Sequence, residues 1–448
     1  MTKTYDLNDF MNALEKRAPN QPEFLQAVED VARDVIPVID EYAEYQDVCI
    51  LERLTEPDRQ ISFRVSWERD DGSIAVNRGY RVQFNSAIGP YKGGLRFHPS
   101  VKPSILKFLG FEQIYKNALT GLPMGGGKGG SDFDPSGCSD AEIERFCHAF
   151  MLELHRHIGP DRDIPAGDIN VGAKEIGYLF GAYKRITGDF QGVLTGKGLS
   201  FGGSEMRVEA TGYGLVYFLK HMLAERDDDL EGKRIAISGA GNVALHAAEK
   251  ALDLGGKVIT LSDSGGTLYH ADGFHEDHIR DIRALKANGG SLEEYTDTLN
   301  SVDWRENEAP WRANAEIALP CATQNELDQD GAKHLVENGC IAIAEGANMP
   351  LTSEAKSIVR ESDTLFAPAK AANAGGVAVS GLEISQNRQR RSFERRDVAE
   401  DLRAIMSGIH SKCLSEGMSE KNTIDYGRGA NIAAFKIVAD AMVAQGVS

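Results

Sequence analysis

Apolar residues recur at helical spacing through much of the first 60 residues, so we expect this region to form helices. The segment VEDVARDVIPVIDEYAEY shows the spacing clearly, and Pro37 is expected to interrupt the helix there. A different pattern follows in ISFRVSWERDDGSIAVNRGYRVQFN, where two runs of β-branched and aromatic residues flank Asp70 to Ser73. This second pattern predicts a β-hairpin.

Helical patterns return after the hairpin. We expect one helix at about 104–120, a second after Cys138, and a third near 174–187 that follows a PAGDINVG loop. Ser139 and Glu142 have the spacing of a capping box, which predicts where the second helix begins.

The pattern changes again near Gly198. KRIAISGAGNVALHAAEKALDLGGKVITLSDS predicts a strand, a glycine turn, a helix and a second strand. The short apolar runs EIALPCAT, CIAIAEGAN and TLFAPAK then alternate with helical stretches, as in a doubly wound parallel sheet. We therefore predict an α/β fold with two domains. The first is an N-terminal α/β substrate-binding and oligomerisation domain at 1–200, and the second is a Rossmann-type dinucleotide-binding domain at 201–424. The C-terminal residues are expected to form helices that pack back across both domains. The helix at about 425–448 is assigned to the first domain.

Composition narrows the function. With 448 residues, a net charge of −18, 42% hydrophobic and 26% charged residues, the chain is typical of a globular protein of two or three domains. The negative charge disfavours binding to nucleic acid or to an anionic membrane. Neither a signal peptide nor a membrane span is recognisable, and the six cysteines are scattered, so we predict a cytoplasmic protein. His275 and His278 do not have the spacing of a metal motif, and no metal is predicted.

A glycine-rich segment at 90–134 carries three lysines, Lys92, Lys116 and Lys128, in surroundings that are otherwise largely apolar. Lys128 lies inside MGGGKGG, where almost no neighbouring side chain is expected to cover it. Glycine allows a ligand to approach the backbone closely, and neighbouring cations and desolvation lower a lysine's pKa. The segment is thus suited to bind a small dianion and to activate a carbonyl or an amine. The alternative is a flexible loop with solvated lysines.

The residues Gly239 to Ala244 form a G-x-G-x-x-A turn between a predicted strand and a predicted helix, which is the context that dinucleotide binding requires. Asp263 ends the second strand, where an acidic residue accepts a ribose hydroxyl of NAD. Ser264 is suited instead to donate to the 2′-phosphate of NADP, with Lys286 or Arg283 to neutralise it. The residues alone leave NAD and NADP both open.

Several long motifs occur in one order along the chain: GPYKGGLRFHPSV, LPMGGGKGGSDFDP, PAGDINVG, TGKGLSFGGS, EATGYGLVYF, GAGNVA, LPCATQNEL, AEGANMP and KAANAGGVAVSGLE. With these motifs, the chain resembles the glutamate dehydrogenase family, and specifically its NADP-dependent hexameric branch. The resemblance covers nearly the whole chain. Ser136 is a departure, since some NADP-dependent relatives have a basic residue there.

The resemblance implies roles for particular residues. Lys128 and Asp168 match the catalytic lysine and carboxylate, Lys92 and Ser380 match the pair that holds the side-chain carboxylate of glutamate, and Gln113 and Lys116 match the pair that binds its α-carboxylate, with the backbone of Gly167 beside the substrate. The cofactor-binding positions are Thr211, Gly239, Gly241, Asn242, Val243, Asp263, Ser264, Lys286 and Asn348.

Two of these roles also agree with the chemistry of the residues. Gln113 and Lys116 are three positions apart, so one helix face presents both. Asp168 follows Pro165-Ala166-Gly167, which we interpret as a turn that is first stiff and then permissive and that can aim the carboxylate into a cleft. The alternative for Asp168 is the N-cap of the next helix.

The predicted function is reversible oxidative deamination of L-glutamate to 2-oxoglutarate and ammonia with NADP(H), running as ammonia assimilation in a cytoplasmic homohexamer. One alternative is an NAD-dependent glutamate dehydrogenase, or a dehydrogenase of the same fold that acts on leucine, phenylalanine or valine. The other is a protein without activity that senses a dinucleotide or 2-oxoglutarate. Lys128 and Asp168 are both present, which disfavours a sensor.

Overall fold

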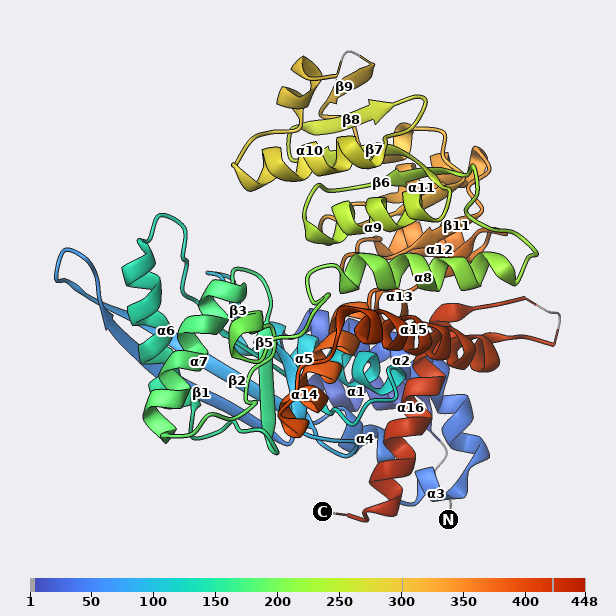
Figure 1. Ribbon diagram of the computed structural model, residues 1–448. Coiled ribbons are helices and arrows are strands. Elements are labelled where there is room, and N and C mark those ends of the chain that lie inside the picture. Colours follow the sequence, from blue (N-terminus) through green and yellow to red (C-terminus); the bar gives the residue numbers. More distant parts are fainter. Residues whose placement is uncertain (1–4, 300, 421–422, 448) are drawn as a thin grey trace. The chain divides into compact units, whose positions relative to one another are not determined.

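The computed structural model describes residues 5–299, 301–420 and 423–447 (Figure 1). The chain divides into two compact units. Unit 1 contains Met1–Glu205, Val379–Val398 and Asn431–Ser448, and unit 2 contains Met206–Ala378 and Ala399–Ala430. Residues 1–4, 300, 421–422 and 448 of the predicted domain ranges lie outside the described residues.

Unit 1 is built on a mixed sheet of five strands. These are β1 (Arg59–Glu68), β2 (Ile74–Asn85), β3 (Tyr91–Phe97), β4 (Gly126–Ser131) and β5 (Asp163–Gly167), in the order β1-β2-β4-β3-β5. The predicted hairpin is confirmed as β1 and β2, which pair antiparallel from Arg59↔Gln83 to Glu68↔Ile74. β2 also pairs antiparallel with β4, whereas β3 pairs parallel with both β4 and β5. Consequently β3 and β5 end on the same edge of the sheet.

Helices cover both faces of this sheet. They are α1 (Leu7–Arg17), α2 (Pro22–Glu41), α3 (Ala43–Gln46), α4 (Ile50–Leu54), α5 (Pro103–Leu119), α6 (Asp140–Leu154), α7 (Ala173–Thr187) and the 3-10 turn η1 (Leu199–Phe201). The helices α6 and α7 pack on one face around an aromatic core that includes Phe97, Phe133 and Phe146. The helix α5 packs on the other face, since a Cβ at Gly126 would meet the Ile114 side chain at 2.5 Å.

Local signals placed these helices well, with one exception. The predicted capping box is present, because Ser139 accepts from the Glu142 N–H and the Glu142 carboxylate accepts from the Ser139 N–H. The expected interruption at Pro37 is wrong, since α2 continues through this residue. A proline inside a helix costs about 3 kcal/mol. The neighbouring Val35 and Ile39 are fully buried, and each such side chain contributes about 1.5–3 kcal/mol, which offsets the cost.

Unit 2 is a Rossmann-type sheet of seven strands. These are β6 (Arg234–Ile237), β7 (Lys257–Asp263), β8 (Gly266–His270), β9 (Val302–Glu306), β10 (Ile317–Leu319), β11 (Ala342–Ala344) and β12 (Leu365–Ala367), in the order β12-β11-β10-β6-β7-β8-β9. The strands from β12 to β7 are parallel, and β8 and β9 add antiparallel to one edge. The strand order reverses direction at β6, and open α/β sheets bind ligands at such a switch point.

The helical segments of unit 2 are α8 (Ala210–Ala224), α9 (Asn242–Asp253), α10 (Glu276–Ala287), η2 (Glu293–Asp297), η3 (Pro310–Arg312), α11 (Gln329–Glu337), α12 (Ser353–Arg360), α13 (Ala369–Ala372) and α15 (Arg395–Gly417). The predicted two-domain α/β architecture with a Rossmann-type unit is confirmed. The three predicted short strands are β10, β11 and β12.

The C-terminal helices return to the body of the protein, as predicted. Most of α14 (Gly375–Gln389) and of α16 (Tyr426–Ala444) belongs to unit 1, and most of α15 belongs to unit 2. Within unit 1, α16 contacts the N-terminal helices, because Asn431 donates to the Asp34 carboxylate at 2.7 Å and Tyr45 donates to Asp440.

Candidate active site

Lys128 lies in β4, near the middle of the unit 1 sheet, and only 5% of its surface is exposed. The glycine-rich segment around it is therefore a buried strand. The expectation that almost nothing covers the lysine is wrong, and so is the alternative of a flexible loop with solvated lysines. Lys128 pairs with Val82 across the antiparallel ladder, so both side chains point to the face that α5 covers. Neighbouring strands and this helix bury the lysine although the adjacent residues are glycines.

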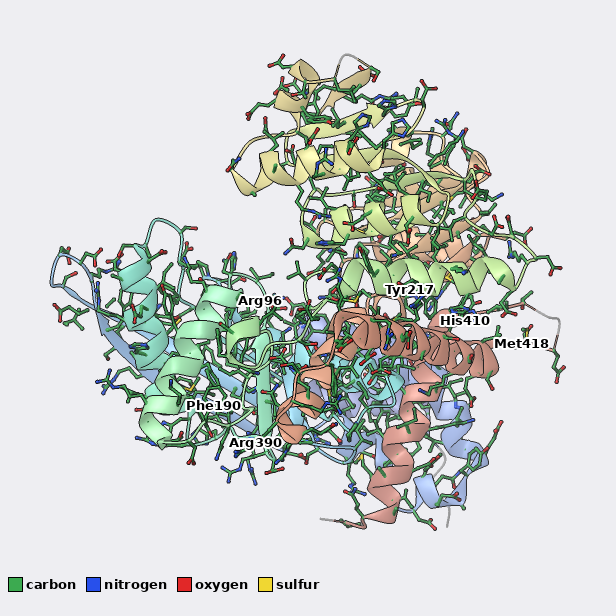
Figure 2. All side chains as sticks on the ribbon, in the orientation of Figure 1. Arg96, Phe190, Tyr217, Arg390, His410 and Met418 are labelled. Carbon is green, nitrogen blue, oxygen red and sulfur yellow. The ribbon has the colours of Figure 1, made fainter. Side chains whose placement is uncertain are left out.

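Asp168 immediately follows β5, and its carboxylate joins two cations. Lys128 Nζ donates to Oδ1 at 3.0 Å, and Arg96 Nε donates to Oδ2 at 2.6 Å. Arg96, labelled in Figure 2, lies on β3, the neighbour of β5. The preceding Pro165 and Gly167 belong to strand β5, so the predicted stiff turn is wrong. A proline is tolerated there because β5 is an edge strand.

The N-cap alternative for Asp168 is also excluded, because α7 begins five residues later and its N-cap is Gly172. The Asp168 carboxylate therefore accepts hydrogen bonds from Lys128 and Arg96, and it does not cap a helix.

The charges of this cluster depend on one another. Burial lowers the pKa of Lys128, the Asp168 carboxylate opposes this, and Arg96 and Arg81 lower it further, so the net change is downward. Burial alone raises the pKa of Asp168, but Lys128 and Arg96 outweigh burial and hold that pKa well below its ordinary value. Asp168 is thus an ionised acceptor at neutral pH, and Lys128 loses its proton more easily than an exposed lysine does.

A second group of polar residues lies where α5 meets β3. Lys92, on β3, is 1% exposed. Gln113 Nε2 donates to Asn117 Oδ1 at 2.8 Å, and Asn117 Nδ2 donates to the Lys92 carbonyl at 3.1 Å. Asn117 therefore fixes the helix face that carries Gln113 and Lys116 against the strand that carries Lys92.

Ser380 lies on α14 and is 2% exposed. The same helix holds the loop at 196–203. The Glu383 carboxylate accepts from the Gly196 N–H at 2.9 Å and from Lys197 Nζ at 2.6 Å, and the Asn387 amide donates to the Gly202 carbonyl at 2.7 Å. Ser380 lies about one helical turn before Glu383. The contacts of Glu383 and Asn387 with the loop therefore also fix the position of Ser380 within unit 1.

Two further positions of the unit 1 site are the last residue of β5, Gly167, and Thr195, whose backbone contacts β5. A Cβ at Gly167 would meet the Val171 carbonyl oxygen at 2.2 Å, so the local chain path requires glycine there, whether or not a substrate contacts its backbone. Thr195 is 1% exposed, its N–H donates to the Pro165 carbonyl at 3.0 Å, and its hydroxyl has no hydrogen-bond partner among the described residues. A buried hydroxyl without a partner is costly unless a ligand satisfies it.

In unit 2, the glycine turn follows β6 and leads directly into α9. Gly239 has a φ of +84°, a conformation that favours glycine. A Cβ at Gly241 would meet nothing within 4 Å, so open space faces this residue. No side chain caps the N-terminus of α9, which begins at Asn242 and Val243. The first N–H groups of α9 can therefore bind phosphate, and the turn fits a dinucleotide.

The helix before β6 contributes Thr211 in its first turn. This helix, α8, packs closely on α9, because a Cβ at Gly212 would lie 2.5 Å from the Ala247 nitrogen and 2.7 Å from the Val243 carbonyl oxygen. The close packing fixes Thr211 relative to the turn. Asn348, in the loop after β11, accepts from Asn373 Nδ2 at 3.2 Å.

The carboxylate of Asp263, at the end of β7, is engaged by its own chain. It accepts from the Leu292 N–H at 2.8 Å, from the Gly265 N–H at 3.1 Å and from Lys286 Nζ at 3.2 Å. Burial alone raises the pKa of Asp263, but these donors outweigh it and lower the pKa. Ser264 is exposed beside it.

The other candidate cation, Arg283, pairs with Glu249 on α9 instead. The structure thus brings together Asp263, Ser264 and Lys286, and does not place Arg283 with Asp263.

Sequence reasoning missed several residues of these sites, among them Arg96, Arg81, Asn117 and Thr195. One signal was available for Arg96. It is four positions after Lys92, and residues two or four apart in a strand share a face. The ion pair of Arg96 with Asp168 spans 72 positions and has no local signature.

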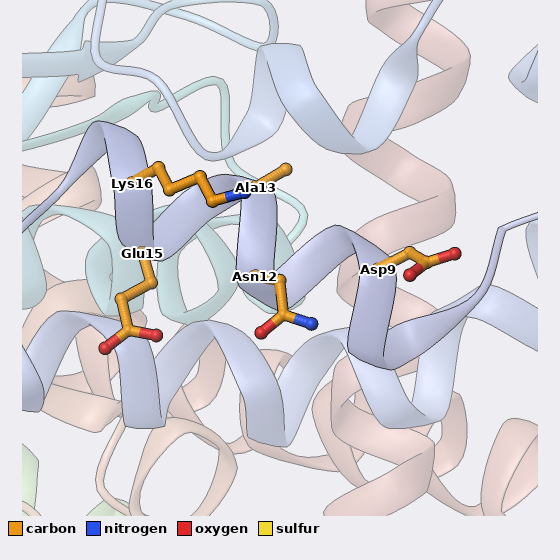
Figure 3. Close-up of a pocket in the computed structure, with 5 residues that line it drawn as sticks. All are labelled: Asp9, Asn12, Ala13, Glu15 and Lys16. Carbon is orange, nitrogen blue, oxygen red and sulfur yellow. The ribbon is translucent and has the colours of Figure 1, made fainter.

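Two hollows on the surface of unit 1 are lined by other residues. One of about 710 Å³ lies along α1 and is lined by Asp9, Asn12, Ala13, Glu15 and Lys16 (Figure 3). Another of about 340 Å³ lies between β2 and the end of α16. Within 5–299, 301–420 and 423–447, no group of three or more histidine, cysteine or acidic residues is arranged to hold a metal ion. None of the helices described is both long and apolar enough to cross a membrane.

A lysine–carboxylate pair in one unit and a dinucleotide turn in the other are features of a pyridine nucleotide-dependent dehydrogenase. Residues 57–185 match the family model "Glu/Leu/Phe/Val dehydrogenase, dimerisation domain", and residues 202–446 match "Glutamate/Leucine/Phenylalanine/Valine dehydrogenase". The chain belongs to this family.

The chain is similar to several proteins over nearly its full length. It is 55% identical to an NADP-specific glutamate dehydrogenase of Psychrobacter sp. (strain TAD1), across 97% of this chain and 98% of that one. It is 52% identical to an NAD-specific glutamate dehydrogenase of Bacteroides fragilis (strain YCH46), across 99% of this chain and 100% of that one. A crystal structure of Plasmodium falciparum glutamate dehydrogenase superposes with a TM-score of 0.96 at 51% identity, covering 99% of this chain and 95% of that one.

Proposed function

We propose that this protein is a glutamate dehydrogenase that interconverts L-glutamate with 2-oxoglutarate and ammonia, using NADP(H). The observation that carries the proposal is the buried contact of Lys128 with Asp168, at 3.0 Å, in a chain of this family. A sensor needs no such pair, whereas proton transfers to and from the substrate nitrogen and the added water need a base and an acid held within hydrogen-bond reach.

Substrate recognition follows from the polar groups of unit 1. A dicarboxylate needs donors or cations at both ends. Lys92 and Ser380 are assigned to the side-chain carboxylate of glutamate, and Gln113 and Lys116 to its α-carboxylate. The buried hydroxyl of Thr195 is a further donor for the substrate. A dehydrogenase for leucine, phenylalanine or valine would need an apolar pocket end in place of buried Lys92.

The chemistry of deamination assigns the two charged partners. Ionised Asp168 first takes a proton from the ammonium group of glutamate, so that hydride can leave the α-carbon. An iminium ion remains, and Lys128 in its neutral form takes a proton from the water that adds to it. Asp168 then returns its proton to the departing nitrogen, and the carboxylate so formed accepts the hydroxyl proton as ammonia leaves and the carbonyl of 2-oxoglutarate forms. Arg96 keeps Asp168 ionised and oriented between these transfers. The reverse sequence of the same transfers assimilates ammonia.

The dinucleotide is assigned to unit 2, where Gly241 and the first N–H groups of α9 would hold its phosphates. When bound, the nicotinamide ring accepts or returns the hydride. The remaining positions, Thr211, Asn348 and the Asp263 region, would position the adenosine and nicotinamide ends.

The preference for NADP is inferred from Asp263. An ionised carboxylate repels a 2′-phosphate, but this one already accepts from Leu292, Gly265 and Lys286. The lysine offsets its charge, and exposed Ser264 remains available to donate to the phosphate. Relatives named for either cofactor are more than half identical to this chain, so overall similarity does not decide the choice.

An assay of the purified protein with 2-oxoglutarate and ammonia, using NADPH and NADH separately, tests the proposal. We expect a higher kcat/KM with NADPH. The substitution Lys286→Glu should reduce or reverse this preference mainly through KM, whereas Lys333→Glu, at an exposed lysine of the same unit, should not. Oxidation of neither nucleotide would refute the activity, and a higher kcat/KM with NADH in the wild type would refute the cofactor assignment alone.

We also propose that the protein assembles as a homohexamer in the cytoplasm. The match of residues 57–185 to a dimerisation domain supports self-association.

A further inference from the structure

A second ion pair lies in the unit 1 sheet, on the face opposite Lys128. Arg81, on β2, donates from Nε to Asp163 Oδ2 at 2.9 Å and from Nη2 to Oδ1, and donates from Nη1 to the Gly93 carbonyl at 3.1 Å. Gln83 Nε2 also donates to Asp163 Oδ2, at 3.0 Å. Neither Arg81 nor Asp163 is exposed to solvent.

This pair connects strands that are not neighbours. Arg81 is on β2 and Asp163 is on β5, and β4 and β3 lie between them. Three strand-to-strand steps amount to about 14 Å at the usual spacing. The arginine side chain must therefore extend across β4 and β3 to reach the carboxylate. Arg81 pairs with Gly129 in the register and Val82 pairs with Lys128, which places the Arg81 and Lys128 side chains on opposite faces of β4.

The glycines of β4 make room for this extended side chain. A Cβ at Gly129 would lie 3.0 Å from Arg81 Cδ, and a Cβ at Gly127 would lie 3.3 Å from Arg81 Nη2. Any larger side chain at these two positions would occupy the path of the arginine. The backbone of β2 and the Leu95 side chain limit the same space. A Cβ at Gly129 would lie 2.8 Å from the Tyr80 carbonyl oxygen and from Leu95 Cδ2, and one at Gly127 would lie 3.0 Å from the Val82 carbonyl oxygen. The glycines at 127 and 129 are thus explained by close strand packing together with the passage of Arg81.

Stability alone does not account for the pair. The cost of desolvating a buried ion pair commonly cancels its attraction, and apolar residues of similar size often replace such a pair without loss. What the ion pair provides is directionality, because the planar guanidinium bonds two carboxylate oxygens and one carbonyl at fixed angles.

We propose that Arg81 and Asp163 are positioning residues for the reaction, which brace β5 against β4 and so set the distance between Lys128 and Asp168. Asp163 begins β5 and Asp168 follows its last residue, so the brace and the reactive carboxylate are at opposite ends of one short strand. This inference rests on the proposed function. Neither residue faces the substrate side of the sheet, and both act through Lys128 and Asp168.

The brace also adds charge beneath the lysine. On its own face, Lys128 lies close to Asp168 and Arg96. The strand β3 also carries Lys92, and α5 carries Lys116. Arg81 is a cation on the opposite face of the sheet. Arg81 lowers the pKa of Lys128, so removing this cation raises that pKa, and removing its counter-ion Asp163 lowers that pKa further. Deamination requires the neutral form of Lys128. The pH at which kcat falls on the acid side of the profile therefore moves with the pKa of Lys128.

Three variants test the brace: Arg81→Lys, Asp163→Asn and Arg81→Met, with Arg78→Met as a matched control at an exposed arginine of β2. Glutamate deamination is measured for kcat, KM and pH profile. Circular dichroism and NADPH binding, which depends on unit 2, report the folded state. A lysine cannot reproduce the fork of Arg81, so kcat of Arg81→Lys should fall roughly 10- to 100-fold, as expected for a misplaced reactive group, with KM changed little.

The acid limb of kcat should move to higher pH in Arg81→Met and to lower pH in Asp163→Asn, with the control unchanged. The first and second variants keep hydrogen-bonding groups, so the test stands even where Arg81→Met does not fold. A folded Arg81→Lys enzyme with wild-type kcat would overturn the proposal. Variants that lose thermal stability while the acid limb of their kcat profile stays at the wild-type pH would overturn it as well. Wild-type protein without activity on glutamate would refute the proposed function instead, before any variant is compared.

Discussion

The two glycines of the dinucleotide turn should respond to the same substitution in opposite ways. Gly241 has an ordinary φ of −87°, and a Cβ there would meet nothing within 4 Å. We expect Gly241→Ala to fold with wild-type stability and to lose affinity for NADPH, because the added methyl group fills the space assigned to the pyrophosphate.

The magnitude follows from the contacts that would be lost. Hydrogen bonds from N–H groups to a charged phosphate are worth about 1.5–3 kcal/mol each. Losing one such bond weakens Kd by roughly 10- to 150-fold, since 1.4 kcal/mol corresponds to a factor of ten. Gly239 differs, because its φ is +84° and an added Cβ would lie 3.2 Å from the Ala322 Cβ. Gly239→Ala should therefore destabilise the protein by about 1–2 kcal/mol from the backbone alone.

Fluorescence titration with NADPH and thermal unfolding distinguish these effects. The expected pattern is a large change in Kd without a change in Tm for Gly241→Ala, and a lower Tm for Gly239→Ala. NADPH binding by Gly241→Ala with wild-type affinity would refute the placement of the phosphates at this turn. A fall in the Tm of Gly241→Ala as large as that of Gly239→Ala would refute the conclusion that a side chain at position 241 has open space around it.

Two further predictions concern unit 1. Asp168→Asn preserves shape but removes the proton acceptor, so kcat should fall by at least about 100-fold, the lower end of the usual contribution of acid–base catalysis; a steady-state assay that shows a change in KM alone would contradict this role. Lys92→Leu combined with Ser380→Val should penalise glutamate and relatively favour an apolar amino acid, because the distal carboxylate loses its partners. An unchanged preference in kcat/KM for glutamate over norvaline would show that Lys92 and Ser380 do not recognise the side chain of the substrate.

Features that are encoded locally were predictable from the sequence. The hairpin needs only two alternating runs and a turn, and the capping box needs only Ser139 and Glu142. The turn from Gly239 to Gly241 was recognisable because its flanking strand and helix are adjacent in the chain.

Features that depend on tertiary packing were not predictable in this way. The continuation of α2 through Pro37 depends on the core that buries its apolar face. Lys128 is covered by strands and by α5, so its own neighbours in the sequence say nothing of its burial. The contacts of Arg81 with Asp163 and of Arg96 with Asp168 join residues 82 and 72 positions apart, and one sequence contains no local trace of such pairs. The roles of the individual site residues stay predictions.

The division of the chain between its two units has a consequence for biosynthesis. Unit 1 contains Val379–Val398 and Asn431–Ser448 in addition to its first 205 residues, and a Tyr45–Asp440 contact joins positions 395 apart. Domains usually fold in order as they leave the ribosome. Here unit 1 cannot be completed until α16 has been synthesised, and the long segment Met206–Ala378 of unit 2 precedes α16 in the chain. The N-terminal helices that α16 contacts therefore stay partly uncovered until α16 has been synthesised.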